Sequence, residues 1–159
     1  MKSASLKEIK QELQHQSQSE LLELCLRLGR FKKENKELLT YLLFEAGNES
    51  RYIESVKEYM DTEFEKININ SYFFIRKSMR KILTNTKKFI RYSKKKETEV
   101  ELLLYYCKKL KAFKPSINRS VRLLNIYNRQ LTLIKKTVTT LHDDLQYDYK
   151  LEIEKLVDS

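Results

Sequence analysis

Apolar and polar positions follow a helical period along most of the 159-residue chain. Two capping boxes, in which a Ser and a Glu three residues later satisfy each other's backbone N–H groups, open the first helices at Ser5 and Ser17. The first helix is predicted over about 4–14. The second is predicted to end at Gly29, because glycine readily adopts the left-handed conformation of a helix terminus.

The same pattern predicts further helices, separated by polar breaks, over 32–47, 48–69, 71–93, 97–111, 116–141 and 143–157, and Pro115 prevents the helix over 97–111 from continuing. Gly47 is expected to stop the third, Asn48 or Ser50 to cap the fourth, and Ser116 to cap the seventh. The chain has only two Gly and one Pro, whereas strand-rich folds need many tight turns. We therefore predict an all-α fold of about eight helices without strands.

The longer helices form two predicted antiparallel hairpins, 48–93 and 97–141, of about 45 residues each. In helix length and hairpin period this part of the chain resembles the HEAT and armadillo-type helical repeats. The resemblance implies a short α-solenoid, and a multi-helix bundle fits the same pattern. We expect one all-α domain, 1–159, made of short N-terminal helices, the two hairpins and an acidic C-terminal helix, over 1–47, 48–141 and 142–159.

The net charge of +10 is unevenly distributed. Residues 66–141 hold 20 Lys or Arg and three acids, giving +17, whereas residues 1–65 carry −3 and residues 142–159 carry −4. Such an asymmetry is typical of proteins with an anionic partner. The abundance of Lys, Ile, Asn and Tyr also fits an AT-rich coding sequence, which would explain part of the lysine content.

The helix expected over 71–93 separates apolar from cationic residues by angle. With Ile75 at 0° and about 100° per residue, one sector from about −40° to +80° is apolar and an opposite sector from about 100° to 240° is cationic. The apolar sector holds Ile75, Met79, Ile82, Leu83, Thr86, Phe89 and Ile90. The cationic sector holds Arg76, Lys77, Arg80, Lys81, Lys87, Lys88, Arg91, Lys94 and Lys95. Like charges four residues apart repel along this helix, which indicates a surface kept cationic for a partner.

The helix expected over 116–141 carries a second basic stripe at intervals of seven residues. Its other sides are mostly apolar, so we expect this helix to lie at the centre of the fold. The candidate polyanion-binding residues of the two helices are Arg76, Lys77, Arg80, Lys81, Lys87, Lys88, Arg91, Arg119, Arg122, Arg129 and Lys136.

A structural interpretation of these stripes stays open beside the functional one. Acids of the 48–69 helix and of the C-terminal helix would then pair with the cations and cover part of the stripe. Five tyrosines accompany the basic region, and they would either stack on bases or lie half-buried in the core. These are Tyr72, Tyr92, Tyr105, Tyr106 and Tyr127.

No catalytic constellation is recognised, so we predict no catalytic residue, no cofactor and no metal site. His15 and His142 have no second His or Cys at ligand spacing, and His142-Asp143-Asp144 is interpreted as a helix cap. The two isolated glycines cannot form a phosphate-binding loop. Cys25 and Cys107 are expected to be buried, reduced thiols.

Two functions follow from these features. The first is a non-enzymatic helical interaction or scaffold module that binds a protein partner. The alternative is nucleic-acid binding through the basic faces of 71–93 and 116–141. No apolar run approaches the roughly 20 residues that span a bilayer, and a peripheral membrane contact of the basic helix is less favoured. We expect a cytoplasmic protein, and the sequence indicates no oligomeric state.

Overall fold

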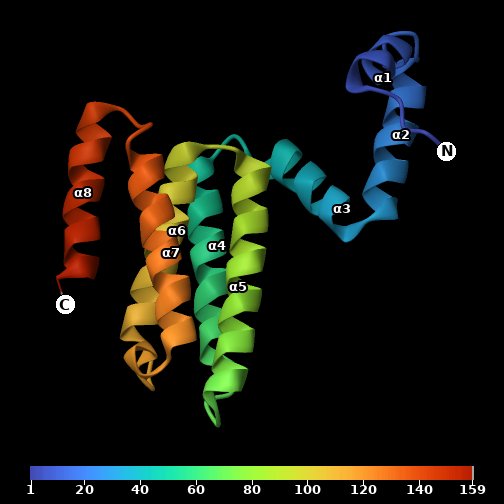
Figure 1. The fold of residues 1–159 in the computed structure, drawn as a ribbon. Coiled ribbons are helices and arrows are strands. Elements are labelled where there is room, and N and C mark those ends of the chain that lie inside the picture. Colours follow the sequence, from blue (N-terminus) through green and yellow to red (C-terminus); the bar gives the residue numbers. More distant parts are fainter. Residues whose placement is uncertain (159) are drawn as a thin grey trace. The chain divides into compact units, whose positions relative to one another are not determined.

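The computed structural model describes residues 1–158 as two compact units, Met1–Phe44 (unit 1) and the chain from Glu45 onward (unit 2). These residues form eight α-helices, a short π-helix and a short 3-10 helix, and no strand (Figure 1). The predicted all-α fold is therefore confirmed. The expectation that the whole chain is one domain stays a prediction.

Unit 1 contains three short helices, α1 (Leu6–Leu13), α2 (Gln18–Phe31) and α3 (Lys33–Thr40). Both predicted capping boxes are present, and the backbone N–H groups of Ser5 and Ser17 each donate to a glutamate at 2.7 Å. None of the three helices buries a side chain. The π-helix η1 (Tyr41–Glu45) follows α3.

The predicted helix stop at Gly29 is wrong, because α2 continues through this residue to Phe31. No glycine of the chain has a positive φ. A Cβ atom at position 29 would lie 3.1 Å from Cδ1 of Leu39 on α3, which is tighter than ordinary van der Waals contact. Gly29 therefore allows α3 to approach α2. Gly47 lies in the turn after η1 and is not a left-handed helix end either.

Unit 2 contains five longer helices: α4 (Glu49–Glu65), α5 (Tyr72–Ser93), α6 (Lys96–Ala112), α7 (Val121–Val138) and α8 (Asp143–Val157). Asn48 caps α4, and α4 ends before the predicted 69. Ser116 caps a 3-10 turn, η2 (Ile117–Arg119), and Ser120 caps α7, so the predicted helix over 116–141 is shorter at both ends. His142 Nδ1 accepts a hydrogen bond from the N–H of Asp144 at 3.3 Å, which confirms the cap interpretation.

The central helix of unit 2 is α6, and not the helix over 116–141 that the sequence analysis expected. Helix α6 contacts α4, α5, α7 and α8. Leu102, Leu103 and Leu104 are all buried. Three consecutive residues of a helix point in different directions, so a helix that buries all three is enclosed on most sides. Helix α7 keeps an exposed side that carries Arg122 and Arg129.

Helices α4, α6 and α8 lie side by side, and each neighbouring pair is joined by polar contacts between residues 44 apart. The Tyr105 hydroxyl donates to Asp61 at 2.8 Å, and the Lys108 ammonium donates to Glu152 at 2.7 Å. Helix α5 packs against α4 and α6, and α7 packs against α6 and α8 (Figure 1). The arrangement fits a short solenoid and a helical bundle alike. The antiparallel hairpins and the HEAT resemblance stay predictions.

The two cysteines lie in different environments. Cys107 is fully buried in α6, where burial raises the pKa of its thiol to about 12. Cys25 is exposed, so the expectation that both thiols are buried is wrong for this residue. Helix α2 buries none of its side chains, so the Cys25 thiol is not enclosed by other residues.

Candidate functional site

The two faces of α5 lie as the helical wheel predicts. Ile75, Met79 and Thr86 are fully buried, and Ile82 and Ile90 are nearly so. None of the eleven candidate cations is buried; Arg76, Lys87 and Lys88 are partly exposed and the others are exposed. The cationic sector of α5 and the stripe of α7 therefore both belong to the surface of unit 2.

Helices α5 and α7 border a groove of about 420 Å³. Its cations are Arg80 and Lys87 from α5 and Arg129 from α7. The remaining lining is apolar or neutral and consists of Leu83, Thr84, Ile126, Gln130 and Leu133. Neither α5 nor α7 contains an acidic residue. The groove is therefore basic at its edges, with apolar side chains between the two helices.

The two basic stripes also approach each other near the N-terminal ends of the helices. Partial desolvation, together with the charges of Arg122 and Arg80, lowers the pKa of the Arg76 guanidinium from its ordinary value. The charge of Arg122, on α7, therefore acts on Arg76, on α5. At the same end of the two helices, the Tyr72 hydroxyl of α5 donates to the backbone oxygen of Ser116, ahead of α7, at 2.8 Å. At about 100° per residue, Arg76, Arg80 and Lys87 occupy only the part of the cationic sector from about 100° to 140°. This part of the sector faces α7.

The structure thus brings together five of the candidate residues: Arg76, Arg80, Lys87, Arg122 and Arg129. Arg80, Lys87 and Arg129 line the groove, whereas Arg76 and Arg122 lie outside its lining on the same two helices. The remaining candidates are Lys77, Lys81, Lys88, Arg91, Arg119 and Lys136. Within residues 1–158, no carboxylate forms an ion pair with any member of the group of five. We call these five residues the basic cluster.

The acidic residues of α4 and α8 contact other cations instead of the basic cluster. Asp61 of α4 lies 2.8 Å from the ammonium of Lys109, and Glu152 of α8 lies 2.7 Å from that of Lys108; both lysines belong to α6. Burial acts to raise the pKa of Asp61, but hydrogen bonds from Lys109 and Tyr105 and the charge of Lys109 outweigh it, so the pKa is lowered.

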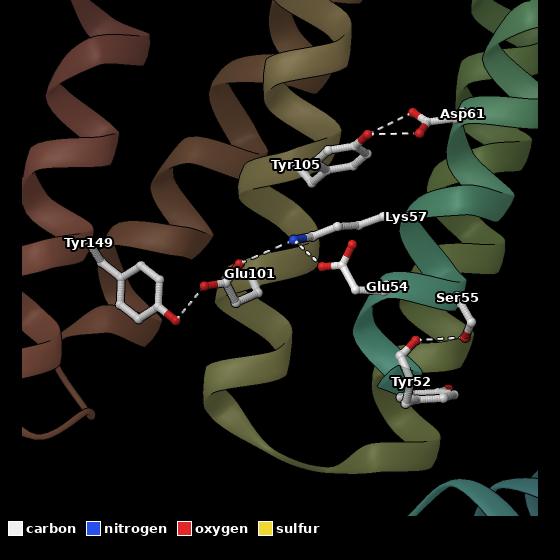
Figure 2. A network of polar contacts seen from close by, with 8 residues as sticks. All are labelled: Tyr52, Glu54, Ser55, Lys57, Asp61, Glu101, Tyr105 and Tyr149. Atoms are coloured by element: carbon white, nitrogen blue, oxygen red, sulfur yellow. Dashed lines mark hydrogen bonds and ion pairs between the residues drawn. The ribbon is translucent and has the colours of Figure 1, made fainter. Parts of the chain in front are cut away.

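The same polar network extends across α4, α6 and α8 (Figure 2). The ammonium of Lys57 on α4 lies 3.0 Å from Glu54 and 3.8 Å from Glu101 of α6. The hydroxyl of Tyr149 on α8 donates to Glu101 at 2.9 Å. The carboxylates of Glu54, Asp61, Glu101 and Glu152 are therefore all engaged in polar contacts on the side of unit 2 formed by α4, α6 and α8. The interpretation in which these acids cover the basic stripes is therefore wrong for the basic cluster.

Gln130 is a polar residue of the groove that the sequence analysis did not single out. Its side chain is only 5% exposed, and its Oε1 has no hydrogen-bond partner among the described residues. An unsatisfied buried amide oxygen costs free energy of folding, about 1–3 kcal/mol. Such a group in a groove between two basic edges is a candidate ligand contact. No sequence pattern marks it, because Gln130 belongs to the buried side of an ordinary amphipathic helix.

The tyrosines of the basic region serve the packing of unit 2. Tyr106 donates to the backbone oxygen of Met79 and Tyr127 to that of Leu156, each at 2.8 Å. Tyr72 donates to Ser116 O at 2.8 Å. Tyr105 binds Asp61 as described above, and the ring of Tyr92 packs edge-on against Phe89. The structural interpretation of these tyrosines is confirmed.

The exposed aromatic residues beside the basic cluster are Phe73 and Phe74, with 59% and 44% exposure. The guanidinium of Arg76 lies 5.7 Å from the centre of the Phe73 ring. Phe73 could have been found from the sequence, because it falls at about 160° on the helical wheel, within the cationic sector of α5.

The structure adds two general observations about residues 1–158. No three His, Cys, Asp or Glu side chains converge in a way that could hold a metal ion. None of the described helices is long and apolar enough to cross a membrane. Comparison of the chain with protein-family models, with curated proteins and with solved structures found no match.

Proposed function

We propose that unit 2 binds nucleic acid through the basic cluster of α5 and α7. The observation that carries the proposal is the convergence of Arg76, Arg80 and Lys87 with Arg122 and Arg129, without a carboxylate that pairs with them. Guanidinium groups bind phosphate oxygens in a bidentate manner, and a row of them follows a phosphate backbone. The predicted cationic face, and not the predicted solenoid shape, is therefore the basis of the function.

Two general arguments favour a polyanion over a single phosphate group. The five cations are spread over more than three turns of α5 and about two turns of α7, which is more than one phosphate can contact. Like charges that are held together on a surface disfavour the folded state unless an anion neutralises them. A chain of phosphates satisfies both conditions.

Fluorescence anisotropy of the full chain with a labelled oligonucleotide tests the proposal. If each of the five cations neutralises one phosphate, the logarithm of affinity falls with the logarithm of salt with a slope of about −3.5 to −4.5. Raising the salt from about 50 to 200 mM then weakens binding roughly 100- to 500-fold. Absence of binding at the lower salt ends the proposal, and an affinity that ignores salt ends the proposed mechanism.

A pair of double variants separates the basic cluster from net charge. Arg80→Gln with Arg129→Gln removes two groove cations, and the slope should become shallower by about 1.4–1.8. Arg51→Gln with Lys150→Gln removes the same charge from exposed positions on α4 and α8 that have no ion pair within residues 1–158. Equal effects of the two variants would show that net charge alone, and not the basic cluster, governs binding.

Protein binding, which the sequence analysis expected first, is a second candidate function, and unit 1 favours it. An apolar groove of about 230 Å³ between α1 and α2 is lined by Ile9, Leu13 and Leu24, and Glu8 and Glu12 stand at the same groove. We propose that the occupant is an amphipathic helix of a partner protein, with apolar residues for the groove and Lys or Arg beside them for the two glutamates.

A photo-cross-linking residue in place of Gln16, which also lines this groove, tests the second candidate. In a lysate of the source cell, a cross-linked peptide with a basic amphipathic helical pattern is expected, and Leu13→Glu should abolish it. A cross-link that persists in Leu13→Glu, a peptide without this pattern, or no cross-link at all would contradict the proposal. The same residue in place of Tyr147, which is exposed on α8, is the matched control position.

A further inference from the structure

We infer that the nucleic acid bound by unit 2 is single-stranded, with one unpaired base stacked on Phe73 and a second base held at Gln130. The inference rests on the proposed function and names the ligand class of the same site. It is carried by two observations that phosphate binding alone leaves unexplained. One is an exposed aromatic ring beside the basic cluster, and the other is an unpartnered amide within the groove.

Phe73 is placed as a platform for a flat ring. Its side chain is 59% exposed in the first turn of α5, and the neighbouring Phe74 ring meets it edge-on at 5.6 Å. Arg76 lies over the Phe73 ring at 5.7 Å. Nucleobases stack on such rings, and a neighbouring guanidinium adds a cation–π contact and binds the adjacent phosphate. The faces of paired bases are covered within a duplex, so this contact requires an unpaired base.

The groove, which begins at Arg80 about two turns along α5 from Phe73, is suited to a base as well as to phosphate. Its volume of about 420 Å³ is in the range of small-molecule sites, and Leu83, Ile126 and Leu133 supply apolar contacts for a flat ring. The Oε1 atom of Gln130 has no hydrogen-bond partner among the described residues, although the residue is only 5% exposed. An amide can donate to and accept from the edge of an unpaired base. Arg80, Lys87 and Arg129 would hold the phosphates on either side.

The exposed ring of Phe73 and the amide of Gln130 would make no base contacts with a fully paired duplex. A protein that binds only the phosphates of a duplex needs cations and neutral donors, and it gains nothing from an exposed phenyl ring or from a buried amide. The combination of cations, an aromatic platform and an apolar groove is typical of surfaces that bind single strands. RNA and DNA share the chemistry on which the inference depends, so the experiment contains both.

Anisotropy measurements with four labelled probes of about 12 nucleotides test the inference on the full chain at about 50 mM salt. The probes are oligo(dT), oligo(rU), an abasic strand with the same phosphates, and a hairpin whose stem is fully paired. Oligo(dT) or oligo(rU) should bind at least about 5-fold more tightly than the abasic strand and the hairpin. The comparison of oligo(dT) with oligo(rU) identifies DNA or RNA as the preferred ligand.

Variants connect this preference to the two residues. Phe73→Ala should lower the affinity for the preferred oligonucleotide at least about 5-fold. Its affinity for the abasic strand should stay within about 2-fold of that of the unmodified protein. Gln130→Met should act in the same direction. Tyr147→Ala, which removes a 67% exposed aromatic residue from α8, is the matched control and should change neither affinity. A melting temperature by circular dichroism that is no lower than that of the unmodified protein excludes a folding defect in each variant.

Each result decides between the inference and the function beneath it. Equal affinity for the base-bearing and abasic strands, tighter binding of the paired hairpin, or a Phe73→Ala variant with unchanged affinity overturns the inference, and the proposed function stands. Absence of binding to all four probes overturns both. The expected pattern is base-dependent binding that Phe73→Ala and Gln130→Met reduce and Tyr147→Ala does not.

Discussion

The positive charge of Arg122 on α7 acts on the guanidinium of Arg76 on α5, although the whole of α6 separates their helices in the sequence. No carboxylate pairs with either residue within residues 1–158. Repulsion between two like charges slightly lowers the free energy of unfolding of the unbound protein. The same two charges attract an anionic ligand. The two residues therefore mark the point at which the basic stripes of two helices become one surface.

Arg122→Gln is the most direct test of this pair. Removing one of two repelling charges should leave the free energy of unfolding unchanged or raise it by about 0.2–0.5 kcal/mol. The same variant should reduce the salt slope of oligonucleotide binding by about 0.7–0.9, because one phosphate contact is lost. Urea denaturation and anisotropy measure the two effects, with Arg51→Gln as control. A loss of stability above about 1 kcal/mol would mean that Arg122 supports the fold.

Gln130→Met should stabilise unit 2 while it weakens binding. The buried amide oxygen has no partner, so an apolar side chain of similar length should raise the free energy of unfolding by about 1 kcal/mol. Thr86→Val is the matched control, because the Thr86 hydroxyl is also buried without a partner but does not line the groove. Thermal denaturation should show a gain in both variants, and only Gln130→Met should lose base-dependent affinity. A gain in neither would indicate that both groups are satisfied by water.

Lys94→Gly should stabilise the end of α5. Lys94 caps this helix with a φ of 58°, and it is the only residue other than glycine with a positive φ in the described chain. The left-handed conformation costs a residue with a side chain about 1–2 kcal/mol, and glycine adopts it freely. Lys94→Ala removes the same charge and keeps the Cβ atom. The free energy of unfolding of Lys94→Gly should therefore be about 1 kcal/mol higher than that of Lys94→Ala. Equal free energies of unfolding would contradict the left-handed cap geometry.

The contact of Asp61 with Lys109 and Tyr105 should appear as a pH dependence of stability. The pKa of Asp61 is lowered from 3.8, so its contribution is complete above that value and is lost as the pH falls through the folded pKa. Asp61→Asn should lower the free energy of unfolding at neutral pH by about 1 kcal/mol. The difference from the unmodified protein should shrink below pH 3.8 in urea denaturation. Glu58→Gln, at an exposed position of α4, should show no such convergence.

The alkaline side provides a second readout of the same contact. Burial, followed by the hydrogen bond and charge of Asp61, raises the pKa of Tyr105 from 10.0 to about 12. A tyrosine whose pKa is higher in the folded than in the unfolded protein stabilises the fold at pH values below its unfolded pKa. This stabilisation is lost as the pH rises from the unfolded pKa through the folded pKa. The stability of the unmodified protein should therefore fall between pH 10.0 and about 12, and Tyr105→Phe should remove the part of that decline that comes from this group. An identical alkaline profile in Tyr105→Phe would contradict the assignment.

Most helix starts were predictable because caps are local, although Ser116, the predicted cap of the seventh helix, caps only a 3-10 turn and α7 begins at Val121. Ser5, Ser17 and Ser71 accept hydrogen bonds from the backbone three residues later, and a sequence pattern contains all that such a bond needs. Helix ends were less predictable. Gly29 has the composition of a stop, but the close approach of Leu39 from α3 uses it inside the helix. Lys94 adopts the left-handed conformation at the end of α5, and no sequence pattern assigns this conformation to a lysine.

The cations of the candidate site were predictable from the sequence, and their arrangement was not. The angular separation on α5 correctly placed its cations on the surface, because burial of Ile75 and Met79 leaves the opposite side to solvent. It could not show that only part of that sector faces α7. Gln130 is a candidate because it lines the groove and its Oε1 atom has no hydrogen-bond partner among the described residues, and both facts depend on the tertiary structure.

The sequence by itself determined the helices and the two faces of α5, since both depend on interactions within about one turn of the chain. Only the tertiary structure decided which charges neutralise each other. Glu49 of α4 pairs with Lys95 at the end of the α5 stripe, but the packing of α6 between its four neighbours brings Lys109 and Lys108 to Asp61 of α4 and Glu152 of α8. Arg76 therefore experiences the charge of Arg122 and pairs with no carboxylate within residues 1–158. Ion pairs form between residues that the fold places side by side, and no local pattern records that placement.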